Sequence, residues 1–402
     1  MERYSEYKDS GVKWLGEIPS HWELRKMKYT FDERSQKGFP NEPLLAATQN
    51  HGVILKSQYE NRTVEATKSL DTLKLVEIGD FVISLRSFQG GLEYAYNRGI
   101  ISPAYTILTP THIKASYFKH LSKSDIFISL LKSSVTGIRE GQNIDYNKLK
   151  ENLLPIPPEE EQKAMGCYLD AATSKIDKAI DMQQKMIDLL NERKQIIIQN
   201  AVTKGLDDKV EMKDSGVEWI GMIPKHWEII KIKHLAKLQS GSNLTSNEIS
   251  DTGSYPVYGG NGLRGFYGSY NCEGSYVLIG RQGALCGNIN YAEDKFWATE
   301  HAVVCYPKKT YNTLWLGEVL RLMNLGQYSL ASAQPGLAVE RIKGLYVPNP
   351  SIEEQNKIAL FLKQNIGKID LYARHCQRQI ALLQERKQII INEVVTGKVK
   401  VS

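Results

Sequence analysis

The stretch LLNERKQIII (residues 189–198) returns almost unchanged as LLQERKQIII (residues 382–391). The offset is 193 residues (382 − 189), and it holds further back, where LPIPPEEEQ (residues 154–162) corresponds to VPNPSIEEQ (residues 347–355). Self-similarity at a fixed offset is the signature of a repeated structural unit. The chain is therefore predicted to contain two copies of one arrangement.

Both copies of this block are predicted to be long helices. Pro157 and Pro158, followed by three glutamates, suit a helix start, and Ser351 with Glu354 has capping-box spacing. Apolar residues then recur in sevens over five heptads, which indicates a coiled coil. The predicted inward positions are Leu169, Thr173, Ile176, Ile180, Gln183, Ile187, Leu190, Lys194, Ile197 and Ala201 in the first copy, and Leu362, Ile366, Ile369, Ala373, Cys376, Ile380, Leu383, Lys387, Ile390 and Val394 in the second.

Each helix is expected to reach Gly205 or Gly397, a length of about 60 Å at about 1.5 Å per residue. We predict an antiparallel pair that relates the two halves by an approximate two-fold axis. Lys194 and Lys387 occupy the same inward position. Such a residue can set register and partner orientation, or its stem can carry the ammonium group out to water, and both interpretations stay open.

A second repeated block precedes each variable part of the chain. KDSGVKWLGEIPSHWELRKMK (residues 8–28) corresponds to KDSGVEWIGMIPKHWEIIKIK (residues 213–233), at an offset of 205 (213 − 8). This offset is 12 larger than that of the helical block (205 − 193), so the material between the blocks is shorter in the second copy. Constant segments thus bracket two dissimilar heads.

The aromatic residues of this block have two interpretations. The set Trp14, Ile18 and Trp22 could form a platform that stacks on nucleic-acid bases, as could its copy Trp219, Ile223 and Trp227. Their place in the constant block favours packing against the helices. His21 and His226 have no second metal ligand nearby in the sequence, so no metal site is predicted.

The heads, residues 29–150 and 234–345, are expected to combine strands, turns and short helices. GDFVISLRSFQGGLEYAY (residues 79–96) and GSYVLIGRQGALCGNINYA (residues 274–292) both predict a strand, a loop that contains glycine and a second strand. Arg86 and Arg281 fall at the same place in these two loops, 195 residues apart (281 − 86).

Arginine on such a loop can bind guanine O6 and N7, and glutamine can bind adenine N6 and N7. A strand-end arginine in a surface ion pair is the competing interpretation. The candidate DNA-binding residues are Arg86, Gln89, Lys56, Arg62 and Arg98 in the first head, and Arg281, Gln282, Asn261, Arg264 and Lys295 in the second.

Composition and motifs limit the remaining function classes. The formal charge of +6 permits binding to a polyanion without requiring it. No apolar run approaches the roughly 18–20 residues of a membrane span, and the start MERYSEY has no export signal, so a cytoplasmic protein is expected. GGNGLRGFYG (residues 259–268) contains G-x-G-x-x-G, but we expect a loop and a strand after it in place of a helix, so a dinucleotide-binding oxidoreductase is only a distant rival. We predict no catalytic centre, and no metal or cofactor bound by this chain.

These features together resemble the specificity subunit of type I restriction-modification enzymes, over nearly the whole chain. The resemblance is carried by YKDSGVKWLGEIPSHW and its copy, by LPIPPEEEQ and VPNPSIEEQ, and by ERKQIII twice. It implies an α+β fold in which two mixed α/β target-recognition domains are separated by two long antiparallel coiled-coil helices, with an internal pseudo-two-fold repeat. Residues 1–150 and 206–345 would be the target-recognition domains, and residues 151–205 and 346–402 the helical segments.

The resemblance also implies a function. The chain would be a non-catalytic subunit that reads a bipartite DNA target and directs adenine methylation and restriction by its partners. These would be two methyltransferase subunits that use S-adenosylmethionine, and restriction and motor subunits that use ATP and Mg. The expected partner-binding residues are Glu192, Arg193, Lys194, Glu385, Arg386 and Lys387. The alternative is a coiled-coil adaptor that binds proteins and no nucleic acid.

Overall fold

The computed structural model describes residues 2–49, 51–59, 70–84, 91–136, 143–283, 285–329 and 336–401 of the chain. They form two compact units, of which unit 1 is Met1–Gln184 with Arg378–Ser402 and unit 2 is Lys185–Gln377. Among the described residues, no helix has the length and apolar character needed to span a membrane. The predicted α+β class, with two mixed heads and two long helices, is confirmed.

The two long helices are α4 (Glu159–Lys204, 46 residues) and α8 (Ile352–Val395, 44 residues), and each contributes one part to each unit. The start of α4 follows Pro158, as predicted. The predicted capping box of α8 is present, because Ser351 N donates to Glu354 Oε2 at 3.2 Å and Glu354 N donates to Ser351 Oγ at 3.2 Å.

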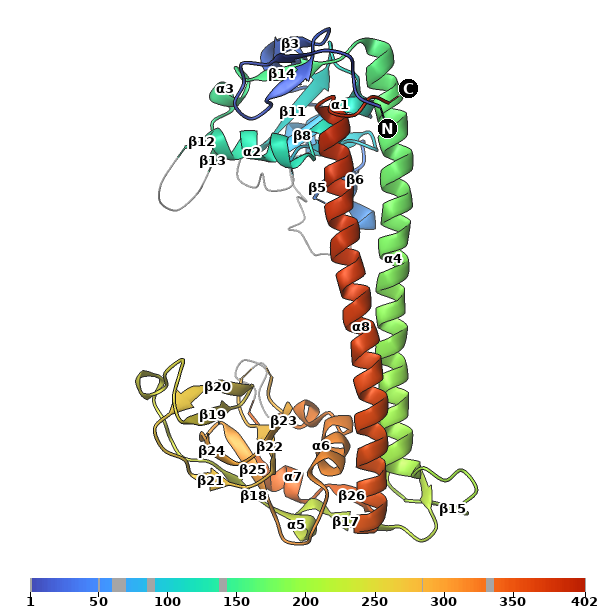
Figure 1. Ribbon diagram of the computed structural model, residues 1–402, viewed down its shortest axis with the longest axis vertical. Coiled ribbons are helices and arrows are strands. Elements are labelled where there is room, and N and C mark those ends of the chain that lie inside the picture. The colour runs from blue at the N-terminus through green and yellow to red at the C-terminus, as the bar shows by residue number, and fades with distance from the viewer. Residues whose placement is uncertain are drawn as a thin grey trace. The chain divides into compact units, whose positions relative to one another are not determined.

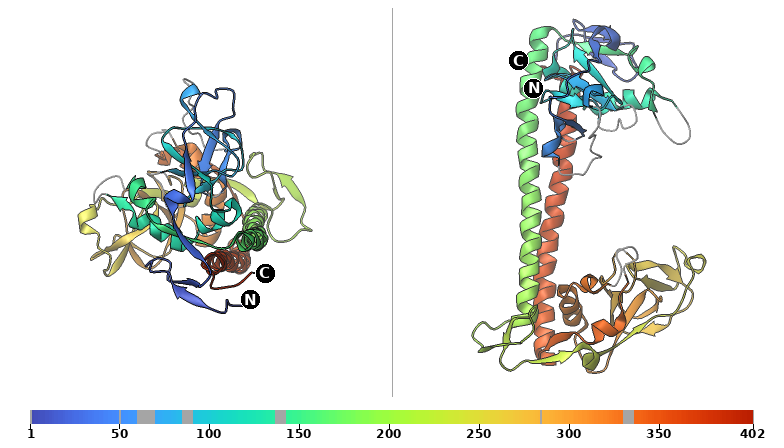
Figure 2. Two further views of the ribbon diagram at one scale, coloured as in Figure 1. Left: turned by 90° about the horizontal axis from the view of Figure 1, so that it is seen from above. Right: turned by 180° about the vertical axis from the view of Figure 1, so that it is seen from behind.

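Within each unit the two helices pack together in antiparallel directions, as Figures 1 and 2 show for α4 and α8. In unit 1, Leu169 of α4 shares a core cluster with Val394 of α8, and Asp177 further along α4 pairs with the earlier Lys387 of α8. All twenty predicted inward positions are buried or half-buried. The heptad interpretation of the sequence is thus confirmed.

The inward lysines form ion pairs across the helix pair. Lys387 Nζ lies 2.6 and 2.8 Å from the two carboxylate oxygens of Asp177 in unit 1, and Lys194 Nζ lies 2.8 Å from Asp370 Oδ1 in unit 2. The two pairs are copies of each other, because 370 − 177 and 387 − 194 both give the repeat offset of 193. The lysines therefore bind the facing helix, which favours the register-setting interpretation.

The head of unit 1 is built on an antiparallel four-stranded sheet. One face packs on the short helices α1 (Ala115–Leu121) and α2 (Asp125–Ser133), and the other on smaller strands. The two central strands contribute to both contacts because their successive side chains point to opposite faces of the sheet. The sheet order is β4 (Phe31–Arg34), β11 (Tyr105–Pro110), β8 (Phe81–Ser84) and β9 (Glu93–Tyr94).

The head of unit 2 repeats this sheet and packs it on α6 (Thr313–Leu322). Its strand order is β18 (Ala236–Ser240), β25 (Ala302–Pro307), β22 (Tyr276–Gly280) and β23 (Ile289–Ala292). The two predicted strand–loop–strand elements are thus β8–β9 and β22–β23. A second four-stranded sheet of unit 2 has the order β20 (Gly262–Tyr267), β19 (Tyr255–Gly259), β24 (Lys295–Ala298) and β21 (Cys272–Glu273).

Smaller elements complete the units. Those of unit 1 are β1 (Tyr7–Asp9), β2 (Glu17–Pro19), β3 (Glu23–Lys26), β5 (Leu45–Thr48), β6 (Gly52–Leu55), β7 (Lys74–Val76), β10 (Gly99–Ile101), β12 (Val135–Thr136), β13 (Asn143–Ile144), α3 (Tyr146–Leu149) and β14 (Leu153–Ile156). Those of unit 2 are β15 (Met212–Asp214), β16 (Met222–Pro224), β17 (Glu228–Lys231), α5 (Ile232–Leu235), α7 (Val339–Lys343) and β26 (Tyr346–Asn349).

In unit 1 the repeated Trp22 joins the start of α4 to the end of α8. Its side chain is fully buried, and Nε1 donates to Glu161 Oε2 at 3.0 Å. A Cβ at Gly397, whose φ is +72°, would lie 2.9 Å from the Trp22 ring. Partial burial raises the pKa of Glu161, but hydrogen bonds from Tyr4, His21 and Trp22 outweigh it, so this pKa lies below its ordinary value.

The copy in unit 2 makes the same connection at the start of α8. Trp227 Nε1 donates to Glu354 Oε1 at 3.0 Å, and His226 Nε2 lies 2.8 Å from the same oxygen. A Cβ at Gly205, where α4 has ended, would lie 3.2 Å from the Trp227 ring. The predicted packing of these tryptophans against the helices is confirmed, and each histidine binds a glutamate.

A buried glutamine connects each head to its long helix. Gln162 is 3% exposed, its Oε1 accepts from Lys114 N at 2.7 Å, and its Nε2 donates to Pro157 O at 2.8 Å. Gln355 is 2% exposed and makes the corresponding bonds to Asn312 N and Pro350 O, at 2.9 and 3.0 Å. The repeated sequence EEQ thus positions both heads.

Candidate nucleic-acid interface

In unit 2 several strands end at one polar edge. The loop after β22 meets the turn before β25, since Arg281 N donates to His301 O at 2.8 Å. The end of β19 meets the end of β24, since Thr299 N donates to Tyr258 O at 2.9 Å. The end of β18 joins them through Ser240, whose Oγ lies 3.3 Å from Arg281 Nη1. Segments far apart in the sequence therefore form one surface.

Arg281 is held firmly at this edge by its main chain. Its carbonyl accepts from Leu337 N at 2.9 Å and from Cys286 Sγ at 3.2 Å. The guanidinium group is half-buried and, across the described part of unit 2, no carboxylate forms an ion pair with it. An arginine held in this way has donors left for another ligand, and the neighbouring Gln282 is exposed.

The turn between β19 and β20 brings two more candidates to the same edge. Asn261 and Arg264 are exposed, and a Cβ at Gly260 would lie 3.0 Å from Gln282 O. Because Gly262 begins strand β20, the G-x-G-x-x-G pattern has no helix after it, and it is a chance match as predicted. The structure thus brings Asn261, Arg264, Arg281 and Gln282 together.

Lys295 lies elsewhere in unit 2, at the beginning of β24. Its Nζ is 4.8 Å from the centroid of the Tyr270 ring and 3.9 Å from Glu273 Oε1. It belongs to the far end of the strand whose other end carries Thr299. Its predicted contact with DNA stays a prediction, separate from the polar edge.

Sequence reasoning missed three polar residues of this edge, Asn290, Thr299 and Glu300, and their neighbour His301. Glu300 Oε1 lies 2.9 Å from His301 Nε2. The available signal was the polar run TEH (residues 299–301) between the apolar strands β24 and β25. Asn290 gave no signal, because it lies within β23 like any strand residue.

The candidates of unit 1 are less fully described. Arg86, Gln89 and Arg62 lie outside the described residues. Lys56 begins a short 3-10 turn (Lys56–Gln58) after β6. Arg98 binds two carboxylates, with its Nε 2.9 Å from Glu42 Oε1 and its Nη1 2.9 Å from Glu77 Oε1, and these contacts hold the turn before β10. All five DNA contacts of this head stay predictions.

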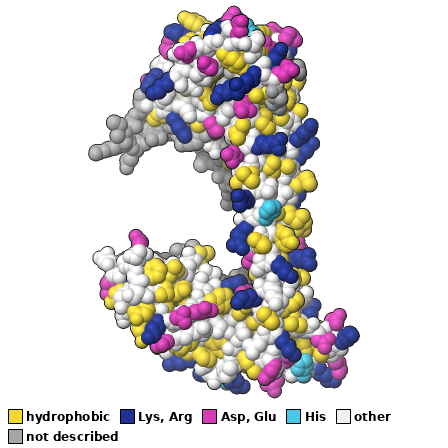
Figure 3. Space-filling view, viewed as in Figure 1, with side chains coloured by type: hydrophobic (Ala, Val, Ile, Leu, Met, Phe, Trp, Pro, Cys, Tyr) yellow, Lys and Arg dark blue, Asp and Glu magenta, His cyan; other side chains and the backbone are white. Residues whose placement is uncertain are grey.

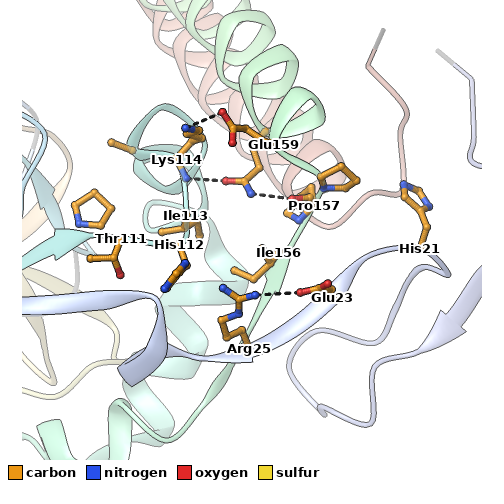
Figure 4. Close-up of a pocket in the computed structure, with 14 residues that line it drawn as sticks. His21, Glu23, Arg25, Thr111, His112, Ile113, Lys114, Ile156, Pro157 and Glu159 are labelled. Carbon is orange, nitrogen blue, oxygen red and sulfur yellow. Dashed lines mark hydrogen bonds and ion pairs between the residues drawn. The ribbon is translucent and has the colours of Figure 1, made fainter.

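A cavity lies in unit 1, where β3, the segment after β11 and the start of α4 meet (Figure 4). It encloses about 630 Å³. Its charged groups bind one another, with Arg25 Nη2 3.2 Å from Glu23 Oε2 and Lys114 Nζ 2.9 Å from Glu159 Oε1. A cavity whose charges are paired in this way offers little to an anionic ligand.

Each long helix carries exposed apolar residues within and next to its ERKQIII segment. Leu189 and Ile196 of α4 are 60% and 50% exposed, and their copies Leu382 and Ile389 of α8 are 49% and 48% exposed. Figure 3 shows hydrophobic side chains among Lys and Arg along the visible face of these helices. The partner-binding candidates Glu192, Arg193, Glu385 and Arg386 are exposed too, whereas Lys194 and Lys387 bind the facing helix.

Comparison with known proteins gives a consistent result. The family model of the type I restriction modification DNA specificity domain matches residues 224–380. The EcoprrI specificity subunit of Escherichia coli is 42% identical over 132 residues, which are 32% of this chain and 33% of that protein. The putative MjaX specificity subunit of Methanocaldococcus jannaschii is 24% identical over 98% of both chains.

Two solved structures share the fold. One, from a study of complex assembly and conformational transition of the type I R-M system, has a TM-score of 0.73 and 14% identity, and covers 95% of this chain and 99% of its own. The other is the HsdS subunit from Thermoanaerobacter tengcongensis, with a TM-score of 0.51, 14% identity and coverage of 97% and 100%. The match thus extends over both units, whereas the more identical EcoprrI match covers only about a third of either chain.

Proposed function

We propose that the chain is a specificity subunit of a type I restriction-modification enzyme and that it reads a bipartite DNA target, with one head reading each half. One observation carries the proposal. In each unit the repeated residues bind the helix ends, whereas the heads between the repeated segments differ in sequence. A constant scaffold with two unlike heads suits the reading of two unlike half-sites.

The polar edge of unit 2 has the groups needed for base recognition. Arg281 and Arg264 can each bind guanine O6 and N7, and Asn261 and Gln282 can bind adenine N6 and N7. The formal charge of +6 supports additional contacts to phosphates. Such contacts set the position of the protein on the duplex and carry no sequence information by themselves.

We propose that partner subunits supply the chemistry. Methyltransferase subunits would use S-adenosylmethionine to methylate adenine, and restriction and motor subunits would use ATP and Mg, while this chain binds none of these cofactors. The exposed apolar residues Leu189, Ile196, Leu382 and Ile389 support a protein partner on the helices, since exposed apolar surface of this kind marks interaction sites. The adjacent exposed Glu192 and Arg193, with their copies, would form the polar rim of that contact.

The proposal is tested by selecting bound duplexes from a random pool with the chain assembled on its methyltransferase subunits. A split motif is expected, and affinity should fall with salt because phosphate neutralisation releases counterions. A complex that binds no duplex, or binds with no salt dependence, would instead support a protein-binding adaptor. The selected motif also supplies the half-sites for the experiments that follow.

Replacing Arg281 with alanine then assigns a half-site to unit 2. The expected loss is about tenfold or more on the full target, corresponding to about 1–3 kcal/mol for an arginine–guanine contact, with relaxed preference at one position of one half-site. An equal loss of affinity for all sequences would make Arg281 a phosphate contact.

A further inference from the structure

A buried polar cluster lies beneath the turn between β19 and β20. Three atoms, Asn290 Nδ2, Thr299 Oγ1 and Glu300 Oε2, are buried and find no hydrogen-bond partner among the described residues. Thr299 is fully buried, whereas Asn290 and Glu300 are half-buried. A buried polar group without a partner costs free energy, and most such groups in folded proteins are satisfied. Three at one edge need a physical reason.

Residues 259–264, here called the glycine hairpin, cover this cluster. A Cβ at Gly259 would lie 3.6 Å from Thr299 Oγ1, and one at Gly262 would lie 2.9 Å from Asn290 Oδ1. The missing side chains therefore let the hairpin backbone pack directly on the cluster. Gly262 also has a φ of +93°, which is unfavourable for residues with a Cβ.

The glycine hairpin has features of an element that can shift. The strand pairing changes register between Val257 and Tyr258, and Gly265 has a φ of +147°. Glycine restricts the backbone less than any other residue, so a change of conformation at Gly265 is inexpensive. The exposed Asn261 and Arg264 would be the first groups of the hairpin to meet a duplex.

We infer that DNA displaces the glycine hairpin, and that the buried polar cluster then binds base edges of the half-site read by unit 2. This inference rests on the proposed function. Asn290 Nδ2 donates to a base acceptor such as N7, Glu300 Oε2 accepts from the exocyclic amino group of adenine or cytosine, and the Thr299 hydroxyl can do either. His301 Nε2, 2.9 Å from the other Glu300 oxygen, holds this carboxylate in place.

The test replaces Thr299 with valine, which has nearly the same shape and no hydroxyl. In the free protein the thermal midpoint is expected to stay or rise, because a hydroxyl without a partner is removed. In the assembled complex, affinity for the full target is expected to fall about tenfold, and affinity for a duplex whose unit 2 half-site is scrambled is expected to stay the same.

The matched control is Thr30→Val in unit 1. Thr30 is fully buried, but its hydroxyl donates to Met27 O at 2.8 Å, so this variant should lower the thermal midpoint and leave DNA affinity unchanged. If Thr299→Val behaves like Thr30→Val, the Thr299 hydroxyl is a satisfied structural group and the inference fails. If the wild-type complex binds no duplex, the proposed function itself fails, which is a distinguishable result.

A second variant keeps the inference falsifiable if Thr299→Val does not fold. Glu300→Gln replaces an acceptor oxygen by an amide, so base preference should change at one position of the unit 2 half-site, with the other half-site unaffected. An unchanged preference in the selected motif would show that Glu300 does not read a base.

Discussion

Replacing Gln162 with leucine tests how the repeated sequence EEQ holds a head on its helix. The wild-type amide accepts from Lys114 N at 2.7 Å and donates to Pro157 O at 2.8 Å. Leucine fills nearly the same volume, so little cavity cost is expected, but both backbone groups lose their partner. Each lost partner costs about 1–3 kcal/mol, so a total of about 2–6 kcal/mol is expected for the two groups.

Hydrogen exchange at the Lys114 amide measures this loss locally. Since about 1.4 kcal/mol corresponds to a factor of ten, a cost of about 2–6 kcal/mol predicts exchange faster by about 30-fold or more. The copy provides the control, because Asn312 N is bound by Gln355 at 2.9 Å and should keep its protection. Gln355→Leu should give the reverse pattern. Unchanged protection at Lys114, or equal acceleration at Lys114 and Asn312, would refute the reasoning.

Three further predictions concern the helices. Lys387→Glu should destabilise unit 1 by up to about 1 kcal/mol, as expected for a partly exposed ion pair, and exchanging the charges of Asp177 and Lys387 should restore most of the lost stability in a double-mutant cycle. A double variant no more stable than Lys387→Glu alone would reject the register role. The pKa of Glu161 is lowered in the folded state, so the stability that this carboxylate contributes is present above its unfolded-state pKa and is lost as the pH falls through its folded-state pKa. Glu161→Gln should therefore reduce the loss of stability at acidic pH, measured by urea unfolding, and an unchanged loss would contradict this. Leu189→Glu with Leu382→Glu should weaken binding of methyltransferase subunits about tenfold or more while helicity by circular dichroism stays the same, and unchanged assembly would place the partner elsewhere.

The scaffold could be predicted from the sequence because it depends on local patterns that occur twice. Heptads identify the inward residues of α4 and α8, and proline, acids and the capping box identify where the helices begin. The carboxylates that bind the inward lysines could not be predicted. Asp177 and Asp370 follow the inward positions Ile176 and Ile369, and which lysine each one meets depends on the register of the antiparallel pair, a property that neither helix carries alone.

The polar edge of unit 2 could be predicted only in part, because it is assembled from distant segments. Arg281 was found through its repeat with Arg86, and Asn261 and Arg264 through their place in a loop. Thr299 lies there because the end of β24 pairs in parallel with β19, a long-range pairing with no sequence signature. The second sheet of unit 2 also differs from the small strands of unit 1, so the repeat offers no comparison at this site.

The pairing beneath each head explains how one scaffold can carry unlike heads. In unit 1 the chain passes from the scaffold into the head through β3 and returns to the scaffold through β14, with Lys26 opposite Leu153. In unit 2 it enters the head through β17 and returns through β26, with Lys231 opposite Tyr346. The two registers correspond under the repeat offsets of 205 and 193, so the difference of 12 residues falls entirely between the paired strands. Because exit and return are bonded side by side, the length and sequence of a head do not change the geometry at the helix ends. Recognition loops can therefore diverge while the repeated residues of the scaffold stay the same.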